Sequence, residues 1–261
     1  MMQFTTPVQV KSSPWKISYK DRLCLLGSCF SDNMAHRMES FYFRFQCNPT
    51  GPLYNPISIA HHMNDDCVKL ADVIIITFGT AWVYEENGVV VDNCQKKPAS
   101  CFNRRRLTVD EIVDTWRPIL ARYSTKKFIF AVSPIRHIKD GLHENQLSKA
   151  ILMLAVERLT FNQPNINYFP SYELLLDELR DYRFYADDLK HPSSMAVSFI
   201  WDRFVNAYME EPTLSEMNEL HQLWLDCQHR PLKPDSAEDV AFQMRVAQER
   251  KHLRIRFPWI Q

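Results

Sequence analysis

Short apolar runs alternate with amphipathic helical segments along most of this chain, and this alternation restricts it to an α/β fold. Short apolar and β-branched runs are typical of strands that are buried on both faces of a sheet. Because helical patterns separate the runs, the sequence predicts a mostly parallel, doubly wound sheet. The segments expected to form its strands are Leu23–Leu26, Phe43–Asn48, Val73–Phe78, Phe128–Ser133 and Ile166–Phe169.

Two parts of the chain depart from this rhythm. Asn87-Gly88, flanked by valines, favours a type I′ turn and predicts a β-hairpin. Residues 93–108 are expected to form a polar loop, and the residues from Thr213 onward a helical tail. We therefore divide the chain into an α/β domain at 1–210, with an insertion at 83–108, and a C-terminal helical extension at 211–261 packed on it.

Composition excludes several classes of protein. The formal net charge of zero argues against binding to nucleic acid, which relies on a positive field. No segment is long and apolar enough to span a membrane, and the start of the chain lacks the pattern of a secretory signal. The seven cysteines are odd in number and form no Cys-x-x-Cys pair, which favours reduced thiols and a cytoplasmic location.

A tight turn follows the first predicted strand. Gly27 permits a sharp bend before an amphipathic helix, for which Ser31 or Asp32 is the expected N-cap. Strand, tight turn and helix is the geometry that presents a nucleophile at the carboxyl edge of a parallel sheet. The turn offers the hydroxyl of Ser28 and the thiol of Cys29, although Cys29 could also be a small buried hydrophobe.

A second chemical candidate lies before the last predicted α/β helix. Asp188 and His191 are three residues apart in a loop. A carboxylate at this spacing can turn back to hold one imidazole nitrogen, which leaves the other as a general base. The alternative is an aspartate at a helix entry beside a solvated surface histidine.

The two candidates together resemble the SGNH (GDSL-type) hydrolase superfamily, and the turn Gly27–Ser31 is similar to the motif that names the GSCFA family. Only Ser31 departs from that motif, where the family has alanine. Further family-like stretches are Asn48–Pro56, Thr77–Trp82, Ser133–His137, Asn145–Lys149 and Asp181–Tyr185. The resemblance implies an SGNH-hydrolase-like (flavodoxin-like) three-layer sandwich with a five-stranded parallel sheet, and ester chemistry that needs no cofactor.

The resemblance also implies roles for individual residues. The first block of the superfamily reads Gly-Asp-Ser, and its serine is the nucleophile. Aligned on this chain, Cys29 takes the place of that serine, with His191 as base and Asp188 as the orienting acid. A register shifted by one residue would give the role to Ser28.

The same resemblance implies an oxyanion hole, and here the chain departs from the superfamily. Gly51 matches the glycine donor after the second strand. The third block, Gly-x-Asn-Asp, corresponds to Gly79-Thr80-Ala81-Trp82, so the donor asparagine is absent. Asn48, Asn55 and Thr80 are the nearby replacements, but Asn55 before Pro56 can equally form a turn.

Other polar residues carry weaker signals. Arg136 and His137 follow the fourth strand, where Arg136 could anchor an anionic substrate group or order a loop. A solvated helix is favoured over a metal site for the His61-His62 pair, and a solvated loop over a phosphate site for Arg104–Arg106. The stretch Asn93–Lys96 resembles a family stretch in which histidine is expected at the position of Gln95.

The sequence therefore predicts a hydrolase for a small-molecule or carbohydrate acyl ester. An O-acyltransferase is one alternative, because an alcohol could resolve the same covalent intermediate. A binding protein that keeps the fold without turnover is the other, and the missing asparagine is the feature that favours it.

Overall fold

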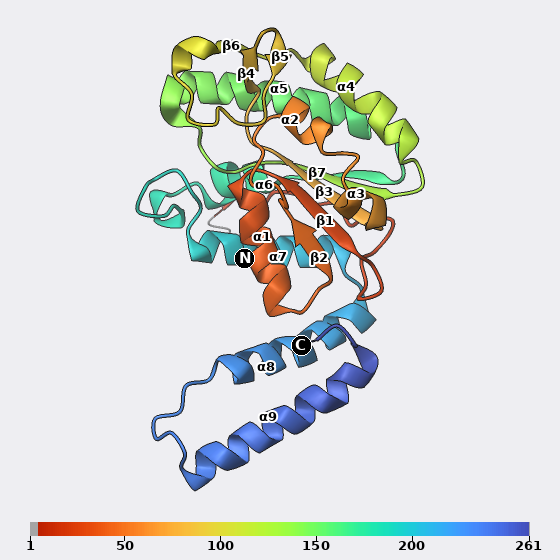
Figure 1. Cartoon of the computed structure of the whole chain (residues 1–261), viewed down its shortest axis with the longest axis vertical. Coiled ribbons are helices and arrows are strands. Elements are labelled where there is room, and N and C mark those ends of the chain that lie inside the picture. The colour runs from red at the N-terminus through yellow and green to blue at the C-terminus, as the bar shows by residue number, and fades with distance from the viewer. Residues whose placement is uncertain (1–4, 261) are drawn as a thin grey trace.

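The computed structural model describes residues 5–260 and contains a five-stranded parallel sheet in the order β2-β1-β3-β7-β8 (Figure 1). All five predicted strands are present, with ends that shift by two residues or fewer, so the predicted sheet is confirmed. The strands are β1 (Leu23–Gly27), β2 (Phe45–Cys47), β3 (Val73–Phe78), β7 (Lys127–Val132) and β8 (Ile166–Phe169).

Helices cover both faces of the sheet, so the predicted three-layer α/β architecture is also confirmed. Alternate strand residues point to opposite faces. Leu25, Ile75 and Ala131 pack against α1 and α7, whereas Ile76 and Phe130 pack against α4 and α5. The helices of this part are α1 (Cys29–Ser40), α2 (Pro56–His61), α3 (Asp66–Leu70), α4 (Val109–Arg122), α5 (Leu142–Thr160), α6 (Ser171–Glu173) and α7 (Ser194–Tyr208). Shorter or wider helical turns are η1 (Ala99–Cys101), η2 (Ile138–Asp140), η3 (Leu174–Leu179) and η4 (Tyr182–Phe184).

The insertion forms a second, antiparallel sheet. The predicted hairpin is present as β4 (Trp82–Glu86) and β5 (Val89–Val90), and positive φ angles at Asn87 and Gly88 fit its turn. The predicted loop is partly wrong, because it contains a third strand, β6 (Asn103–Arg106), paired with β4. The arginines of β6 are extended because they contact side chains of β4. The Arg104 guanidinium lies 4.1 Å from the centre of the Trp82 ring, and Arg105 pairs with Glu85.

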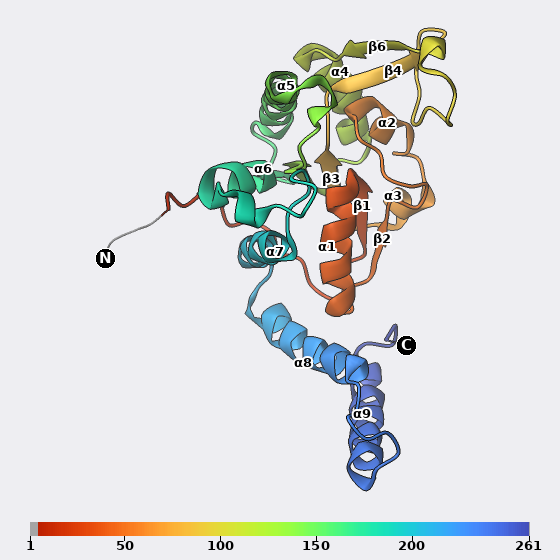
Figure 2. The same cartoon turned by 90° about the vertical axis from the view of Figure 1, so that its left-hand side faces the viewer.

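The C-terminal residues form a helical hairpin of α8 (Glu211–Gln228) and α9 (Ala237–Arg256). Figures 1 and 2 show this hairpin at the end of the molecule away from the β4–β6 sheet. It docks near the C-terminal end of α1, where Nδ1 of His221 in α8 lies 3.1 Å from the Ser40 carbonyl oxygen. The hairpin therefore lies at the opposite end of α1 from Cys29. Among residues 5–260, none of the helices is both long enough and apolar enough to cross a membrane.

Candidate active site

The turn after β1 separates the two candidate nucleophiles by their exposure. Ser28 is fully buried and is the N-cap of α1, because its hydroxyl oxygen accepts the Phe30 N–H at 3.3 Å. The predicted cap at Ser31 or Asp32 is therefore wrong. Cys29 is the first residue of α1 and is partly exposed, with its Sγ atom 3.1 Å from the Tyr54 hydroxyl.

Asp188 and His191 form a hydrogen-bonded pair in the loop before α7. The Asp188 Oδ2 atom lies 2.5 Å from His191 Nδ1. The other carboxylate oxygen accepts the backbone N–H groups of His191 and Lys190, at 3.0 and 2.9 Å. These three bonds hold the pKa of Asp188 well below its usual range. The second ring nitrogen, Nε2, has no hydrogen-bond partner in the described part of the chain, so it is available to accept a proton.

Arg136 fixes this loop to the carboxyl end of β7. Its backbone N–H donates to the Lys190 carbonyl oxygen at 3.1 Å, and its guanidinium donates to the Leu189 carbonyl oxygen at 3.2 Å. The guanidinium also lies over the rings of Tyr182 and Tyr185, with its carbon 5.6 and 5.3 Å from their centres. The contacts that Arg136 makes with described residues order this loop, through its backbone, its guanidinium and the two tyrosine rings.

His137 lies where the ends of β1, β3 and β7 converge. A Cβ atom added to Gly79 would lie 3.2 Å from both His137 Nε2 and Ser28 Cβ. Burial lowers the pKa of His137 to about 3, and the nearby charges of Lys149 and His191 add to the effect. The ring is therefore neutral at neutral pH, and it packs edge-on against Tyr54 with centroids 5.8 Å apart.

The backbone donors expected for an oxyanion hole are bonded within the protein. The Gly51 N–H donates to the Asn48 carbonyl oxygen at 2.8 Å. The N–H groups of Gly79 and Thr80 both donate to the Tyr54 carbonyl oxygen, each at 2.8 Å. These bonds hold the loops that follow β2 and β3 together.

The side chains expected as replacement donors are also engaged. Asn55 caps α2 by accepting two backbone N–H groups, and its amide donates to the Ser58 hydroxyl at 2.8 Å. The Thr80 hydroxyl lies 3.1 Å from that of Ser148. By contrast, the backbone N–H of Cys29 finds no acceptor among the described residues, as is usual for the first N–H of a helix.

Two residues at this edge had not been singled out from the sequence, Tyr54 and Lys149. Lys149 is fully buried, and its ammonium group donates to the carbonyl oxygens of Gly79 and Ser133 at 2.6 and 2.7 Å. It therefore joins the ends of β3 and β7, while burial lowers its pKa to about 7. A lysine within the otherwise apolar stretch 147–155 is the signal that could have identified it. For Tyr54, the signal is an aromatic residue in a loop at the carboxyl edge.

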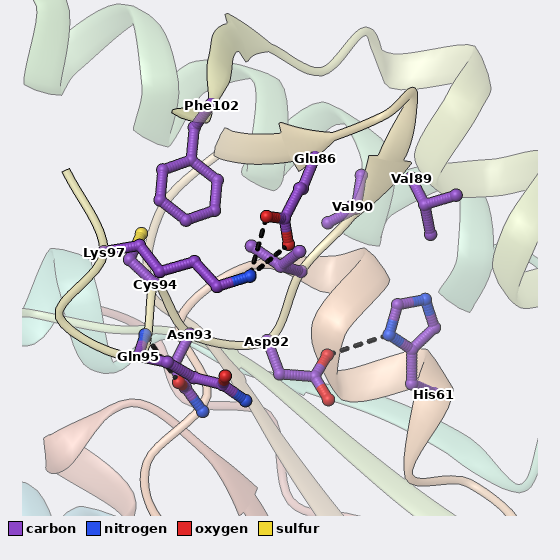
Figure 3. Close-up of a pocket in the computed structure, with 11 residues that line it drawn as sticks. His61, Glu86, Val89, Val90, Asp92, Asn93, Cys94, Gln95, Lys97 and Phe102 are labelled. Atoms are coloured by element: carbon purple, nitrogen blue, oxygen red, sulfur yellow. Dashed lines mark hydrogen bonds and ion pairs between the residues drawn. The ribbon is translucent and has the colours of Figure 1, made fainter. Parts of the chain in front are cut away.

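A cavity of about 360 Å³ adjoins the site, between the carboxyl edge and the β4–β6 sheet. The side chains that shape it include Tyr54, Trp82, Tyr84, Arg104, His137 and Lys139. A second cavity, of about 370 Å³, shares the segment Val91–Cys94 as a wall (Figure 3). Figure 3 shows Lys97 paired with Glu86 across it and Asp92 bonded to His61. Gln95 lines this second cavity.

Asp92 ties the shared wall to α2. Its two oxygens lie 2.8 Å from His61 Nδ1 and 3.0 Å from His62 Nε2. His62 Nδ1 is in turn 2.8 Å from Asp65. Within residues 5–260, no group of three or more His, Cys, Asp and Glu side chains is arranged to hold a metal ion. Burial opposes a charge on His62, but the hydrogen bonds to Asp65 and Asp92 outweigh it and raise the pKa of His62.

Replacing His62 by alanine is expected to remove stability mainly at low pH. A histidine whose pKa is raised by folding contributes stability that is fully present below its unfolded pKa, about 6.5, and lost as the pH rises through its folded pKa. The variant should lose on the order of 1 kcal/mol at pH 6 and much less at pH 9. Urea unfolding at both pH values measures this, with exposed His36→Ala as the control. An equal loss at both pH values would contradict the ion-pair explanation.

Several solved structures are similar to this chain. Axe2, an acetylxylan esterase from Geobacillus stearothermophilus, is 12% identical with a TM-score of 0.46, and the match covers 75% of this chain and 97% of that one. A GDSL-like lipase from Bacteroides thetaiotaomicron is 12% identical with a TM-score of 0.47, covering 72% and 87%. LAE5, an α/β hydrolase from the metagenome of Lake Arreo, Spain, is 13% identical with a TM-score of 0.47, covering 73% and 96%. No protein of curated function matches the chain significantly.

A family model covers most of the α/β part of the chain. The model of the GSCFA family matches residues 22–69 and 64–204. The matched span begins just before β1 and ends within α7, so it includes both the Cys29 turn and the loop with Asp188 and His191. The chain therefore belongs to the GSCFA family, as the resemblance of its first turn predicted.

Proposed function

We propose that this protein hydrolyses acyl esters through a covalent intermediate on Cys29. The observation that carries the proposal is the contrast within one turn, where Ser28 is buried as a helix cap and Cys29 is partly exposed. A bonded Asp188–His191 pair, with Nε2 unoccupied by other described groups, is anchored to the same sheet edge through Arg136. A thiol, a base and a carboxylate that orients the base are the components of nucleophilic acyl transfer.

In this reaction His191 Nε2 takes the thiol proton, and the sulfur electron pair forms a bond to the ester carbonyl carbon. The carbonyl π electrons move to oxygen. When that oxyanion collapses, the C–O bond to the alcohol breaks, and the imidazolium returns its proton to the departing alkoxide. Water, deprotonated by His191, then attacks the thioester. The C–S bond breaks to release the carboxylic acid, and the imidazolium returns the proton to the departing Cys29 thiolate. Asp188 stabilises the imidazolium that forms in each half-reaction.

The cavity beside the site supports a small-molecule or carbohydrate ester as substrate. Its volume of about 360 Å³ is within the range of small-ligand sites. The rings of Trp82 and Tyr84 line it, and the Arg104 guanidinium lies over both rings. The β4–β6 sheet and the segment Val91–Cys94 enclose it from one side, and exclusion of water there would favour transfer to an alcohol. O-acyl transfer is therefore the second candidate function.

Competitive labelling tests the proposal. The protein is treated with iodoacetamide and, separately, with a fluorophosphonate, and the labelled residues are mapped over time. Cys101 is exposed and serves as an ordinary thiol in the same chain. We expect Cys29 to be alkylated at least about tenfold faster than Cys101, because in the proposed mechanism His191 takes the proton of the Cys29 thiol. We expect His191→Ala to abolish the difference. A fluorophosphonate label on Ser28 would move the nucleophile by one residue.

Product analysis separates the three functions. With p-nitrophenyl acetate, hydrolysis predicts acetate as the product whether or not an alcohol is added. Transfer predicts that glycerol or a sugar acceptor diverts the acetyl group into a new ester. A binding protein without turnover predicts neither product and no selective label on Cys29 or Ser28.

A further inference from the structure

The site as described has too few donors for the negative charge that develops on a carbonyl oxygen. The N–H groups of Gly51, Gly79 and Thr80 are all bonded within the protein. Ala81 stands where the superfamily has its donor asparagine, and an alanine side chain cannot donate. The Cys29 backbone N–H is available, but an oxyanion hole normally combines two or more donors.

The Tyr54 hydroxyl is the polar side-chain group in contact with the proposed nucleophile. It lies 3.1 Å from Cys29 Sγ. Burial raises the pKa of Tyr54 well above its usual range, and the neighbouring Cys29 sulfur adds to the rise. The phenol therefore keeps its proton at neutral pH and is the donor toward an anionic sulfur.

Two kinds of contact position Tyr54, which is 38% exposed. The Tyr54 carbonyl oxygen accepts the N–H groups of Gly79 and Thr80, which ties its backbone to the end of β3. Its ring meets that of His137 edge-on, with the ring planes at 80°. Because the pKa of His137 is lowered to about 3, that contact does not change with protonation near neutral pH. A donor held in advance of the reaction requires little reorganisation when charge develops.

We propose that Tyr54 is a catalytic residue whose hydroxyl, together with the Cys29 backbone N–H, forms the oxyanion hole. This inference rests on the proposed role of Cys29. In the tetrahedral adduct the sulfur and the oxyanion are bonded to the same carbon, so a donor in contact with the sulfur is within reach of the oxyanion. As the C–S bond forms, negative charge leaves the sulfur and appears on the carbonyl oxygen. The Tyr54 hydroxyl then donates its hydrogen bond to that oxygen instead of to the sulfur. The phenol proton stays on Tyr54 throughout.

Two reactions of the same thiol test this role in a Tyr54→Phe variant. Acylation by p-nitrophenyl acetate passes through an oxyanion, whereas alkylation by iodoacetamide does not. We expect the acylation rate to fall about 100-fold, the effect of removing one oxyanion donor. The alkylation rate of Cys29 should stay within about a factor of three, because losing the hydroxyl lowers the thiolate fraction but makes the remaining thiolate more nucleophilic. Phenylalanine keeps the ring against His137, and thermal unfolding checks that the variant is folded.

A second tyrosine provides the matched control. The Tyr123 hydroxyl donates to the Met63 carbonyl oxygen at 2.6 Å, away from the site, so Tyr123→Phe should leave both rates unchanged. Equal falls in acylation and alkylation for Tyr54→Phe would mean that the hydroxyl only prepares the thiol, and would overturn the oxyanion role. Unchanged acylation would overturn it as well. Failure of iodoacetamide to label Cys29 selectively in the unmodified protein is a separate result, which would remove the proposed function and this inference together.

Discussion

Replacing His191 by alanine is expected to lower kcat/KM for an activated ester by about 10²- to 10⁴-fold, the contribution that a general base typically makes. His191 Nδ1 is held by Asp188 at 2.5 Å, and its Nε2 has no hydrogen-bond partner among the described residues. Without it, neither the Cys29 thiol nor the hydrolytic water has a base, so both half-reactions slow. The side chain is partly exposed, and the fold should therefore be almost unaffected.

Steady-state kinetics with p-nitrophenyl acetate measure the effect, with thermal unfolding as the check on structure. Exposed His36 on α1 is the control, because its replacement by alanine removes an imidazole far from the loop before α7. Asp188→Asn should fall in the same range, because an amide cannot stabilise the imidazolium as a carboxylate does. A loss of less than about tenfold for His191→Ala would exclude His191 as the general base.

Replacing Gly27 by alanine is expected to lower the free energy of unfolding by more than about 3 kcal/mol. Gly27 has a φ of +146°, and an added Cβ would lie 2.2 Å from the Thr77 carbonyl oxygen. That oxygen belongs to the backbone of the central strand β3, so it cannot move aside without disturbing the sheet. For a chain of this size, the corresponding fall in Tm is about 10 °C.

Gly88 supplies the matched control for this substitution. It also has a positive φ, of +79°, but an added Cβ would meet nothing within 4 Å. Gly88→Ala should therefore cost only the backbone strain, about 1 kcal/mol. Urea unfolding of both variants separates strain from steric overlap. Equal losses at the two positions would contradict the overlap with β3.

The parallel sheet could be predicted from the sequence because its signal is local. Strands such as Val73–Phe78 are buried along their whole length, so each is apolar throughout and is visible without knowledge of its neighbours. The strand β6 could not be predicted in this way. Its residues are mostly arginines, and their extended conformation depends on Trp82 and Glu85, contributed by another strand.

In the candidate site, too, contacts between residues close in sequence could be predicted, and contacts between distant loops could not. Asp188 and His191 are three residues apart, so their contact could be predicted from spacing alone. The oxyanion donors could not, because each N–H acquires its acceptor from a different loop. Gly79, for example, donates to Tyr54, which lies 25 residues earlier in the chain.

The sequence by itself determined the parallel sheet, the tight turn at its edge and the Asp188–His191 pair, since each depends on residues close together in the chain. Only the tertiary structure decided how that turn is used. The Ser28 hydroxyl caps the first turn of α1, whereas the Cys29 thiol contacts Tyr54, which belongs to a neighbouring loop. These differences arise from burial and from partners distant in sequence, which local patterns do not record.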